Sequence, residues 1–382
     1  MMKHYLLAPG PTPIPPAVLQ AMAQPIIHHR TPEYEAIFAE VRRDLRCLFQ
    51  CRNEVLMFAA SGTGAMEAAI VNTLSPGDAV LVVRGGKFGE RWAEICEAYG
   101  LRVLPVDVPY GKSVDPAAVA AALARAPGVA AVFATHSETS TGAVHDIQGI
   151  AAHLRDTPAI LVVDAITSLG VMDLPMDAWG VDIVVAGSQK ALMLPPGLAF
   201  AGVSDKAWAR VPSARLPKFY FSFTAEKKAI AKNQSAYTPA VSLVVGLRES
   251  LRLILAEGLP AVFARHDRLA RATRAGVQAL GLALFAERPG AACTAVQAPP
   301  GIDGGAIVKG LRARGITIAG GQGSMKGKIF RIAHMGYVAD FDVLTALAGL
   351  ELVLGDLGYP VARGASLRAA EEVLGHQGRG DA

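Results

Sequence analysis

Apolar residues in this chain recur in two patterns, and their alternation predicts a layered α/β fold. Short runs rich in Val, Ile, Leu and Ala predict buried strands at 55–60, 79–83, 102–106, 130–135, 159–165, 182–188 and 197–204. Amphipathic spacing predicts helices at 36–49, 61–74, 89–100 and 115–126. Strands separated by helices indicate a mainly parallel sheet that is covered on both faces. Because ligands bind beyond the carboxyl ends of such strands, we expect the chemistry there.

The pattern changes after about residue 245. Two long helical stretches, 242–258 and 260–280, lead into a second αβ segment that contains LALFAE, GAIVKGLRARG, ITIAG and IFRIAH. We therefore predict an N-terminal arm at 1–16, a large domain at 17–264 and a small C-terminal domain at 265–382. We expect the proline-rich arm to run along the first domain or to reach a partner chain.

Composition narrows the class of protein. The chain is 52% hydrophobic and 18% charged, so it can bury a large core and is not disordered. A charge, Gly or Pro interrupts every apolar run before the roughly 18 residues that a membrane span needs. The net charge of +4 is small and scattered, which argues against nucleic-acid binding. The first residues, MMKHYLLAPGPTP, do not form a signal peptide.

The cysteines give no sign of a metal site. Cys47, Cys51, Cys96 and Cys293 form no CxxC pair, and scattered thiols suit a reducing cytoplasm. Cys47 and Cys51 are four residues apart, and we expect them to share one helix face as small core residues.

A lysine and an aspartate follow neighbouring predicted strands. Asp164 ends the strand in AILVVDAITSLG, and Lys190 follows the next one in DIVVAGSQKALMLPPG. An apolar setting lowers the pKa of a lysine amine and makes it a nucleophile for carbonyls. The simpler alternatives are a loop lysine that reaches solvent and an aspartate satisfied by backbone donors at a helix start. The pair together favours pyridoxal phosphate (PLP), whose ring nitrogen pairs with Asp and whose aldehyde forms a Schiff base with Lys.

A phosphate site should accompany this pair. The stretch Ser61-Gly62-Thr63-Gly64 lies between a predicted strand and a helix, where hydroxyls, close backbone approach and the helix N-terminus favour an anion. The alternative is that Ser61 is a simple N-cap. The later stretch GGQGSMKGK (320–328) fails the spacing of a Walker loop.

These motifs together resemble the class V aminotransferases of PLP fold type I, in the alanine–glyoxylate and serine–glyoxylate branch. The resemblance covers the whole chain. It is carried by LLAPGPTPIPP (6–16), SGTGAMEA (61–68), GGKFGERW (85–92), THSETSTG (135–142), VVDAITSLG (162–170), GSQKALMLPPG (187–197), AYTPAVSL (236–243), GLRESL (246–251) and GKIFRIAHMG (327–336). It implies a mainly parallel seven-stranded sheet and a smaller αβ domain.

The resemblance also implies roles for single residues. Lys190 would carry PLP as a Schiff base and move the proton, and Asp164 would keep the ring nitrogen protonated. The phosphate would be held by Ser61, Gly62 and Thr63 with Gln189, while Thr139 would bind the phenolic oxygen and Phe88 would stack on the ring. Tyr237 and Thr238 would reach the phosphate of the neighbouring subunit, which implies a homodimer with composite sites.

Arg331 and Gly10 are the substrate residues that the resemblance implies. A guanidinium is the natural partner of an α-carboxylate, and the alternative is a surface Arg on a strand. The segment His28-His29-Arg30 resembles one near the partner's site, and at most one of these residues is expected to reach the ligand. His136 could pack against the cofactor or be an ordinary core histidine.

The sequence therefore predicts a cytoplasmic transaminase that passes the amino group of a small amino acid, alanine or serine, to a 2-keto acid such as glyoxylate or pyruvate. Aspartate is the alternative donor, and Arg30 or Arg84 could then bind its second carboxylate. A PLP-dependent lyase resembling cysteine desulfurase is a further alternative, although no cysteine lies in the loop before Arg331. A nicotinamide oxidoreductase is disfavoured because no GxGxxG turn follows the first strand.

Overall fold

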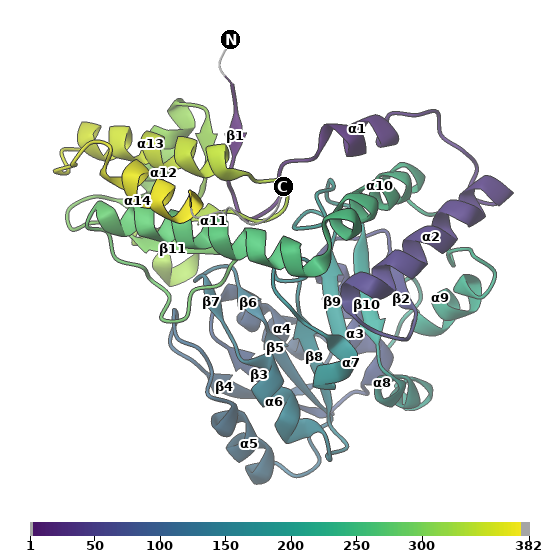
Figure 1. Cartoon of the computed structure of the whole chain (residues 1–382). Helices are drawn as coiled ribbons and strands as arrows, with labels where there is room; N and C mark the ends of the chain where they lie inside the picture. Colours follow the sequence, from purple (N-terminus) through teal and green to yellow (C-terminus); the bar gives the residue numbers. More distant parts are fainter. Residues whose placement is uncertain (1–2, 376–382) are drawn as a thin grey trace.

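The computed structural model describes residues 3–375 and is built around a seven-stranded sheet. Figure 1 shows this sheet at the centre of the larger part of the molecule. In spatial order the strands are β2 (Val55–Phe58), β10 (Ala199–Val203), β9 (Ile183–Gly187), β8 (Ile160–Asp164), β5 (Ala131–Thr135), β3 (Ala79–Arg84) and β4 (Arg102–Asp107). The predicted seven strands are therefore confirmed.

One strand runs against the others. The β10 strand is antiparallel to β9 and β2, whereas the remaining neighbours are parallel. Only residues 188–198 connect β9 to β10. A connection this short can join antiparallel strands but not parallel ones. The chain consequently reverses at the end of β9, within the segment that contains Lys190.

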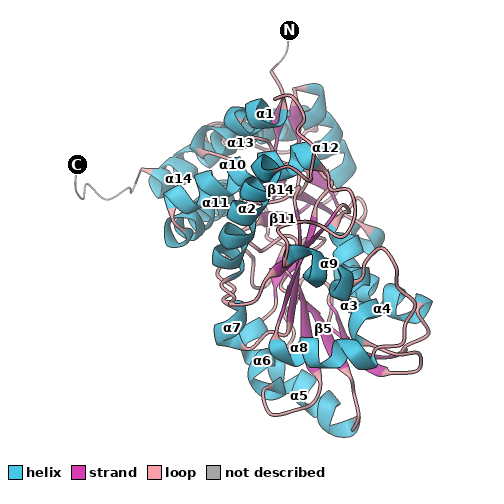
Figure 2. Ribbon diagram, turned by 90° about the vertical axis from the view of Figure 1, so that its right-hand side faces the viewer, coloured by secondary structure: helices cyan, strands magenta, loops and turns pink. Residues whose placement is uncertain are grey.

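Helices cover both faces of this sheet. In Figure 2 the sheet lies between α6 and α7 on one side and α3 and α4 on the other. The helices of this part are α1 (Pro16–Met22), α2 (Pro32–Phe49), α3 (Gly62–Thr73), α4 (Lys87–Ala98), α5 (Pro116–Arg125), α6 (Ile147–Leu154), α7 (Met176–Trp179), α8 (Asp205–Arg210), α9 (Phe223–Ile230) and α10 (Val241–Glu257). The two-sided cover explains the continuous apolar strands of the interior, whereas the edge strand β4 is partly exposed.

A second hydrophobic core forms around an antiparallel sheet of β11 (Cys293–Gln297), β14 (Ile329–Ala333) and β13 (Ala319–Gly320). It is covered by α12 (Gly304–Ala313), α13 (Asp340–Asp356) and α14 (Ala365–Leu374). The helix α11 (Leu259–Ala279) joins the two cores, with Val262 in the first and Leu269 in the second. The domain boundary predicted at 264/265 falls inside this helix and stays a prediction.

The N-terminal arm contacts both units of the molecule. Its strand β1 (Tyr5–Leu6) pairs in parallel with β12 (Ile316–Thr317), and Leu7 is buried in the second core. The backbone at 5–7 pairs with the edge of β12, so its N–H groups bond to the carbonyls of Gly315 and Thr317. The proline-rich stretch 9–16, for which we expected a course along the first domain, does run there: Thr12 bonds to the Gln189 and Lys190 carbonyls, and Ile14 packs against the first core.

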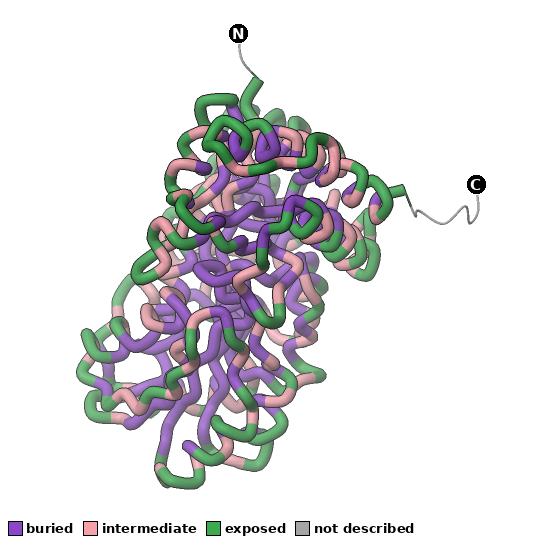
Figure 3. Tube along the Cα trace, turned by 90° about the vertical axis from the view of Figure 1, so that its left-hand side faces the viewer, coloured by how far each residue is buried: buried purple, intermediate pink, exposed green. Residues whose placement is uncertain are grey.

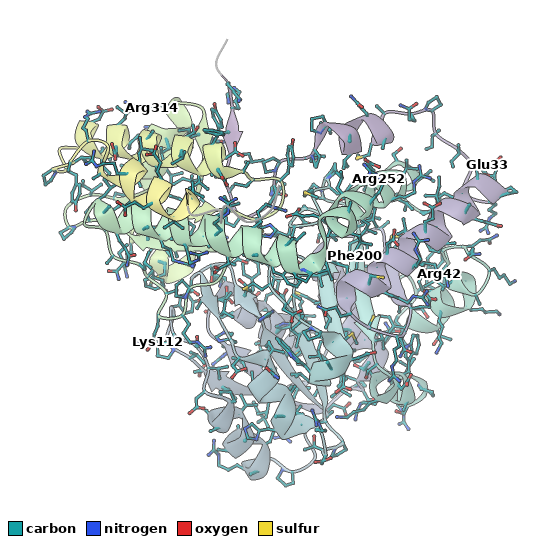
Figure 4. All side chains as sticks on the ribbon, in the orientation of Figure 1. Glu33, Arg42, Lys112, Phe200, Arg252 and Arg314 are labelled. Carbon is teal, nitrogen blue, oxygen red and sulfur yellow. The ribbon has the colours of Figure 1, made fainter. Side chains whose placement is uncertain are left out.

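Buried residues fill the interior of both units, as Figure 3 shows. Figure 4 contrasts Phe200, which is buried on β10, with Glu33, Arg252 and Arg314 at the surface. None of the helices within residues 3–375 combines the length and apolar character that a membrane span requires.

The expected pairing of two cysteines on one helix face was wrong. The α2 helix ends at Phe49 because Gln50 adopts a left-handed conformation, so Cys51 lies outside the helix. Cys47 is exposed. The two thiols therefore do not form the shared core face.

Candidate active site

Lys190 lies in the reversal between β9 and β10, buried with 8% of its surface exposed. Its Nζ donates a hydrogen bond to the Pro9 carbonyl of the arm. Burial lowers the pKa of Lys190 to about 8. An amine in this environment is neutral often enough near physiological pH to attack a carbonyl carbon. The alternative of a solvent-reaching loop lysine is therefore wrong.

The arm holds the Lys190 loop in place. The Thr12 hydroxyl donates to the Lys190 carbonyl at 2.7 Å, and the Thr12 N–H donates to the Gln189 carbonyl at 3.2 Å. Gly10 has a φ of +101°, and a Cβ added there would lie 2.5 Å from Lys190 Nζ. The predicted substrate residue Gly10 thus lies directly against the lysine. Only a residue without a side chain leaves this space to the amine.

Asp164 ends β8 and pairs in register with Thr135 of β5 and Val185 of β9. Its Oδ1 accepts the Ile166 N–H at 2.8 Å, which is the backbone-donor arrangement considered as an alternative. One such bond does not offset burial, which raises the pKa of Asp164 to about 7. The carboxylate therefore still favours a cationic partner.

The first turn of α3 offers free backbone N–H groups, which can bind an anion, close to Asp164 and Lys190. Ser61 is its N-cap residue, but the hydroxyl makes no capping bond and the residue is exposed. Gly62 and Thr63 open the helix, so their N–H groups have no intrahelical partner. Nearby, Gln189 Oε1 is buried without a partner among the described residues. A Cβ on Gly187 would lie 3.0 Å from that oxygen and 3.3 Å from Gly62 N, so the two groups adjoin.

Phe88 is held at the start of α4 by a buried carboxylate that the sequence did not reveal. Glu138 Oε2 accepts the N–H groups of Phe88 and Gly89 at 3.1 and 3.0 Å. Ser140 donates to the other carboxyl oxygen through its N–H and its hydroxyl. Burial raises the pKa of Glu138, whereas these donors oppose the shift. An acidic side chain at a helix N-terminus is also stabilised by the helix dipole.

Arg331 reaches the same region from the centre of β14. Its Nε and Nη2 donate to the Gly320 carbonyl at 3.0 and 2.8 Å, and its Nη1 donates to the Thr139 carbonyl at 2.8 Å. The guanidinium is buried, so the alternative of a surface arginine is wrong. Of its five N–H groups one remains on each terminal nitrogen, which suits a bidentate carboxylate. The Thr139 hydroxyl lies 2.6 Å from that of Thr167.

Cys293 also belongs to this neighbourhood, although it lies outside the loop before Arg331. Its thiol is 3.8 Å from the Thr139 carbonyl and is buried. Burial raises the pKa of Cys293, while Arg331 and Lys190 lower it. The thiol form that results is a weak nucleophile.

Tyr237 and Thr238 lie elsewhere in this chain. Tyr237 donates to the Phe219 carbonyl at 3.0 Å and stacks on Tyr220, with ring centroids 5.1 Å apart. Both predicted residues line a small cavity at the end of β2, together with Phe58. Their predicted role at a partner's phosphate stays a prediction.

The histidine segment adjoins that same surface. Arg30 donates to Gln234 at 2.5 Å, and the His28 and His29 rings contact each other in a tilted arrangement with centroids 4.6 Å apart. His136 is buried beside the end of β5, and burial lowers its pKa to about 4. Its Nδ1 has no partner among the described residues, so it is not an ordinary satisfied core histidine.

The family comparison decides the identity of this site. The sequence profile described as "Aminotransferase class-V" matches residues 4–338. The chain belongs to the class V aminotransferases. It is therefore a PLP-dependent transaminase, as the sequence motifs indicated.

Full-length relatives of this aminotransferase carry several names. It is 46% identical to the soluble hydrogenase small subunit of a Synechococcus species, over 97% of this chain and 98% of that one. It is 41% identical to L-aspartate–glyoxylate aminotransferase of Paracoccus denitrificans, covering 97% and 96%. It is also 41% identical to serine–glyoxylate aminotransferase of Hyphomicrobium methylovorum, covering 96% and 94%.

The fold is shared with solved aminotransferases. The crystal structure of ureidoglycine–glyoxylate aminotransferase from Bacillus subtilis superposes with a TM-score of 0.94 at 32% identity, covering 98% of this chain and 99% of that one. Because the match covers nearly the whole chain, the likeness includes both the large sheet and the smaller C-terminal sheet. The PLP fold type I assignment is therefore confirmed.

The residues of the site fit PLP on their own chemistry. Asp164 is a buried carboxylate that favours a cation, and the Gln189 amide, whose NH2 group can donate to a phosphate, adjoins the free N–H groups of α3. Lys190 is an amine with a lowered pKa. Among residues 3–375, no group of three or more His, Cys, Asp or Glu side chains is arranged to hold a metal ion.

Proposed function

We propose that this aminotransferase transfers the amino group of a small L-amino acid, alanine or serine, to glyoxylate or a similar 2-keto acid. The observation that carries the proposal is the convergence of Lys190, Asp164 and Arg331 on one buried site. The names of the relatives from Paracoccus and Hyphomicrobium support glyoxylate as the acceptor.

Each residue of the site has one task in this proposal. PLP, when bound, supplies an electron-withdrawing ring that makes the substrate Cα acidic. Lys190 Nζ would hold the cofactor covalently, and as a free amine it would move a proton at the substrate Cα. Asp164 keeps the ring nitrogen protonated, and Phe88 packs on the ring face. The two free N–H groups of Arg331 orient the substrate α-carboxylate.

The choice of donor rests on the arginines around the site. Arg84 forms a bidentate pair with Asp107, with distances of 2.7 and 2.9 Å. Arg30 lies on the surface against Gln234. Within one chain, therefore, neither candidate for a second carboxylate contacts the residues that hold Arg331, which supports a donor with one carboxylate. Aspartate is the second candidate, because the Paracoccus relative is named for it.

A desulfurase-like lyase reaction is disfavoured on a specific observation. Such a reaction needs a mobile thiolate near the substrate. Cys293 is the cysteine near Arg331, and it lies on a strand, 1% exposed and with a raised pKa.

The assignment of Lys190 can be tested directly. PLP added to the cofactor-free enzyme should give a visible absorption band, and borohydride reduction should leave the added mass on the peptide that contains Lys190. Lys190→Ala should lose both signals and amino transfer. Lys218→Ala is the matched control, because burial also lowers the pKa of Lys218 but its Nζ only contacts carbonyls of its own loop. A wild-type enzyme without the band would overturn the proposal.

The donor is tested by half-reactions. Loaded enzyme is mixed with alanine, serine or aspartate, and loss of the band is followed without an acceptor. Alanine or serine should react faster than aspartate by at least about tenfold, since a second carboxylate without a cationic partner is costly to bury. A reaction with aspartate alone would make aspartate the donor.

A further inference from the structure

Arg91 is a half-buried cation that extends from α4 to the first turn of α3. Its guanidinium carbon lies 5.0 Å from the centroid of the Phe88 ring, and its Nη1 donates to the Thr63 hydroxyl at 3.3 Å. It therefore lies between the ring proposed to stack on the cofactor and the turn proposed to hold the phosphate. The motif GGKFGERW contains this residue, but the sequence assigned it no role.

The charge of Arg91 acts on the site. Burial raises the pKa of Asp164 and lowers the pKa of Lys190, and Arg91 is among the charges that lower both. The Arg91 charge therefore lies within electrostatic reach of both Asp164 and Lys190.

The nearby cations Arg84 and Lys87 each pair with a carboxylate, whereas Arg91 does not. Arg84 pairs with Asp107 at 2.7 Å, and Lys87 pairs with Glu90 at 2.5 Å. No carboxylate among residues 3–375 lies within 4.0 Å of the Arg91 guanidinium. A partly desolvated guanidinium without an anion is unfavourable, and a ligand anion would satisfy it.

The proposed phosphate cradle lacks a formal positive charge. Its members are backbone N–H groups of Gly62 and Thr63, hydroxyls and the Gln189 amide. Lys190 cannot supply the charge, because its amine would be bonded to the aldehyde carbon of PLP. A phosphate dianion in a partly buried site is stabilised by a guanidinium, which offers paired donors as well as charge. Arg91 is the cation that adjoins this cradle, at Thr63.

We propose that Arg91 is a further cofactor-binding residue whose guanidinium pairs with the PLP phosphate beside Thr63. The inference rests on the proposed function. A distal substrate carboxylate is the competing ligand. It is disfavoured because Arg91 contacts the α3 turn, whereas the substrate residue Arg331 contacts Gly320 and Thr139.

Two aldehydes that differ only in the phosphate test this pairing. Cofactor-free wild type, Arg91→Gln and Arg91→Lys are titrated with PLP and with pyridoxal, and binding is followed by absorbance and protein fluorescence. Arg91→Gln should raise the Kd of PLP by roughly 10- to 100-fold, as expected for one charge-assisted hydrogen-bonded pair. The Kd of pyridoxal should change less than about threefold, and Arg91→Lys should be intermediate. Arg84→Gln is the matched control and should leave both constants unchanged.

Other results would overturn the inference in distinguishable ways. Equal losses for PLP and pyridoxal would mean that Arg91 only supports the Phe88 ring. An unchanged Kd of PLP with a raised KM for aspartate would mean that Arg91 binds a substrate carboxylate. Thermal melting of each cofactor-free variant shows whether it folds, and Arg91→Lys provides the comparison if Arg91→Gln does not. If wild type itself binds no PLP, the proposed function fails, whereas tight binding by both wild type and Arg91→Gln contradicts only this inference.

Discussion

Burial shifts the pKa values of the two central ionisable residues of this site in opposite directions. It raises the pKa of Asp164 to about 7 and lowers that of Lys190 to about 8. In both cases desolvation disfavours the charged form, and nearby charges compensate only in part. Without the cofactor the folded protein therefore carries an acid and an amine that both titrate close to neutral pH.

This arrangement predicts a pH-dependent stability of the cofactor-free protein. In the unfolded chain Asp164 ionises near its ordinary pKa of 3.8, whereas in the folded protein it holds its proton until about pH 7. The folded state thus binds more protons in this window, so its stability falls as pH rises from about 4 to 7. Between pH 5 and 8 the loss attributable to Asp164 should be about 2.5 kcal/mol.

Urea unfolding at pH 5 and pH 8 measures this loss, with Asp164→Asn as the comparison. Glu226 contributes a slope of the same sign, because burial raises its pKa to about 7 as well. The difference between wild type and Asp164→Asn cancels that shared contribution. The variant should be less sensitive to pH than wild type, and equal slopes in the two proteins would contradict the prediction.

At the scale of elements, the active site is assembled by contacts between segments that are far apart in the chain. The arm at Pro9–Thr12 packs on the Lys190 loop, and the 137–140 hairpin fixes the start of α4 through Glu138. In both contacts a glycine allows the backbone of one segment to approach a side chain of the other. A Cβ on Gly86 would lie 2.4 Å from Glu138 Cδ, and one on Gly10 would meet Lys190.

We expect Gly10→Ala to impair PLP loading more than it impairs folding. The added Cβ would force Lys190 Nζ to move, and the φ of +101° adds strain of roughly 1–2 kcal/mol. Gly180→Ala is the matched control, because it also places a side chain at positive φ but meets no atom within 4 Å. Stopped-flow absorbance should show PLP capture at least about tenfold slower in Gly10→Ala and normal in Gly180→Ala. Similar capture by the two variants would refute this role for Gly10.

The sequence predicted elements better than it predicted contacts. Continuous apolar runs identified every strand of the large sheet, and successive strand ends identified Asp164 and Lys190. The short strand β11 (Cys293–Gln297) was not recognised, since Thr294 and Gln297 interrupt its apolar run. The stretch ITIAG divides into β12 and β13, which pair with different strands. Glu138 and Arg91 were missed because their partners lie on other elements, and local patterns do not encode such contacts.

On the scale of the whole molecule, the loops around 26–30 and 219–238 form an apolar surface remote in sequence from Lys190. Ile26 is 74% exposed in the first segment and Phe219 is 80% exposed in the second, where Tyr220 stacks on Tyr237, and Arg30 joins the two segments through Gln234. Exposed aromatic and aliphatic residues of this kind are typical of a surface that binds a partner. Because Thr238 lies at this surface, we propose that a second copy of the chain covers it and receives Tyr237 and Thr238 into its own site.

Paired variants in one dimer test whether the sites are composite. Co-expression with two affinity tags isolates a hybrid of a Lys190→Ala subunit and a Thr238→Glu subunit, each of which should be inactive as a homodimer. If Thr238 serves the partner's site, one site of the hybrid carries both changes and the other carries none, so about half of the wild-type activity should return. The hybrid of Lys190→Ala with Arg331→Gln is the control and should stay inactive, because both residues belong to the site of their own chain. If the first hybrid also stays inactive while sedimenting as a dimer, then Thr238 acts within its own subunit and the composite site is wrong.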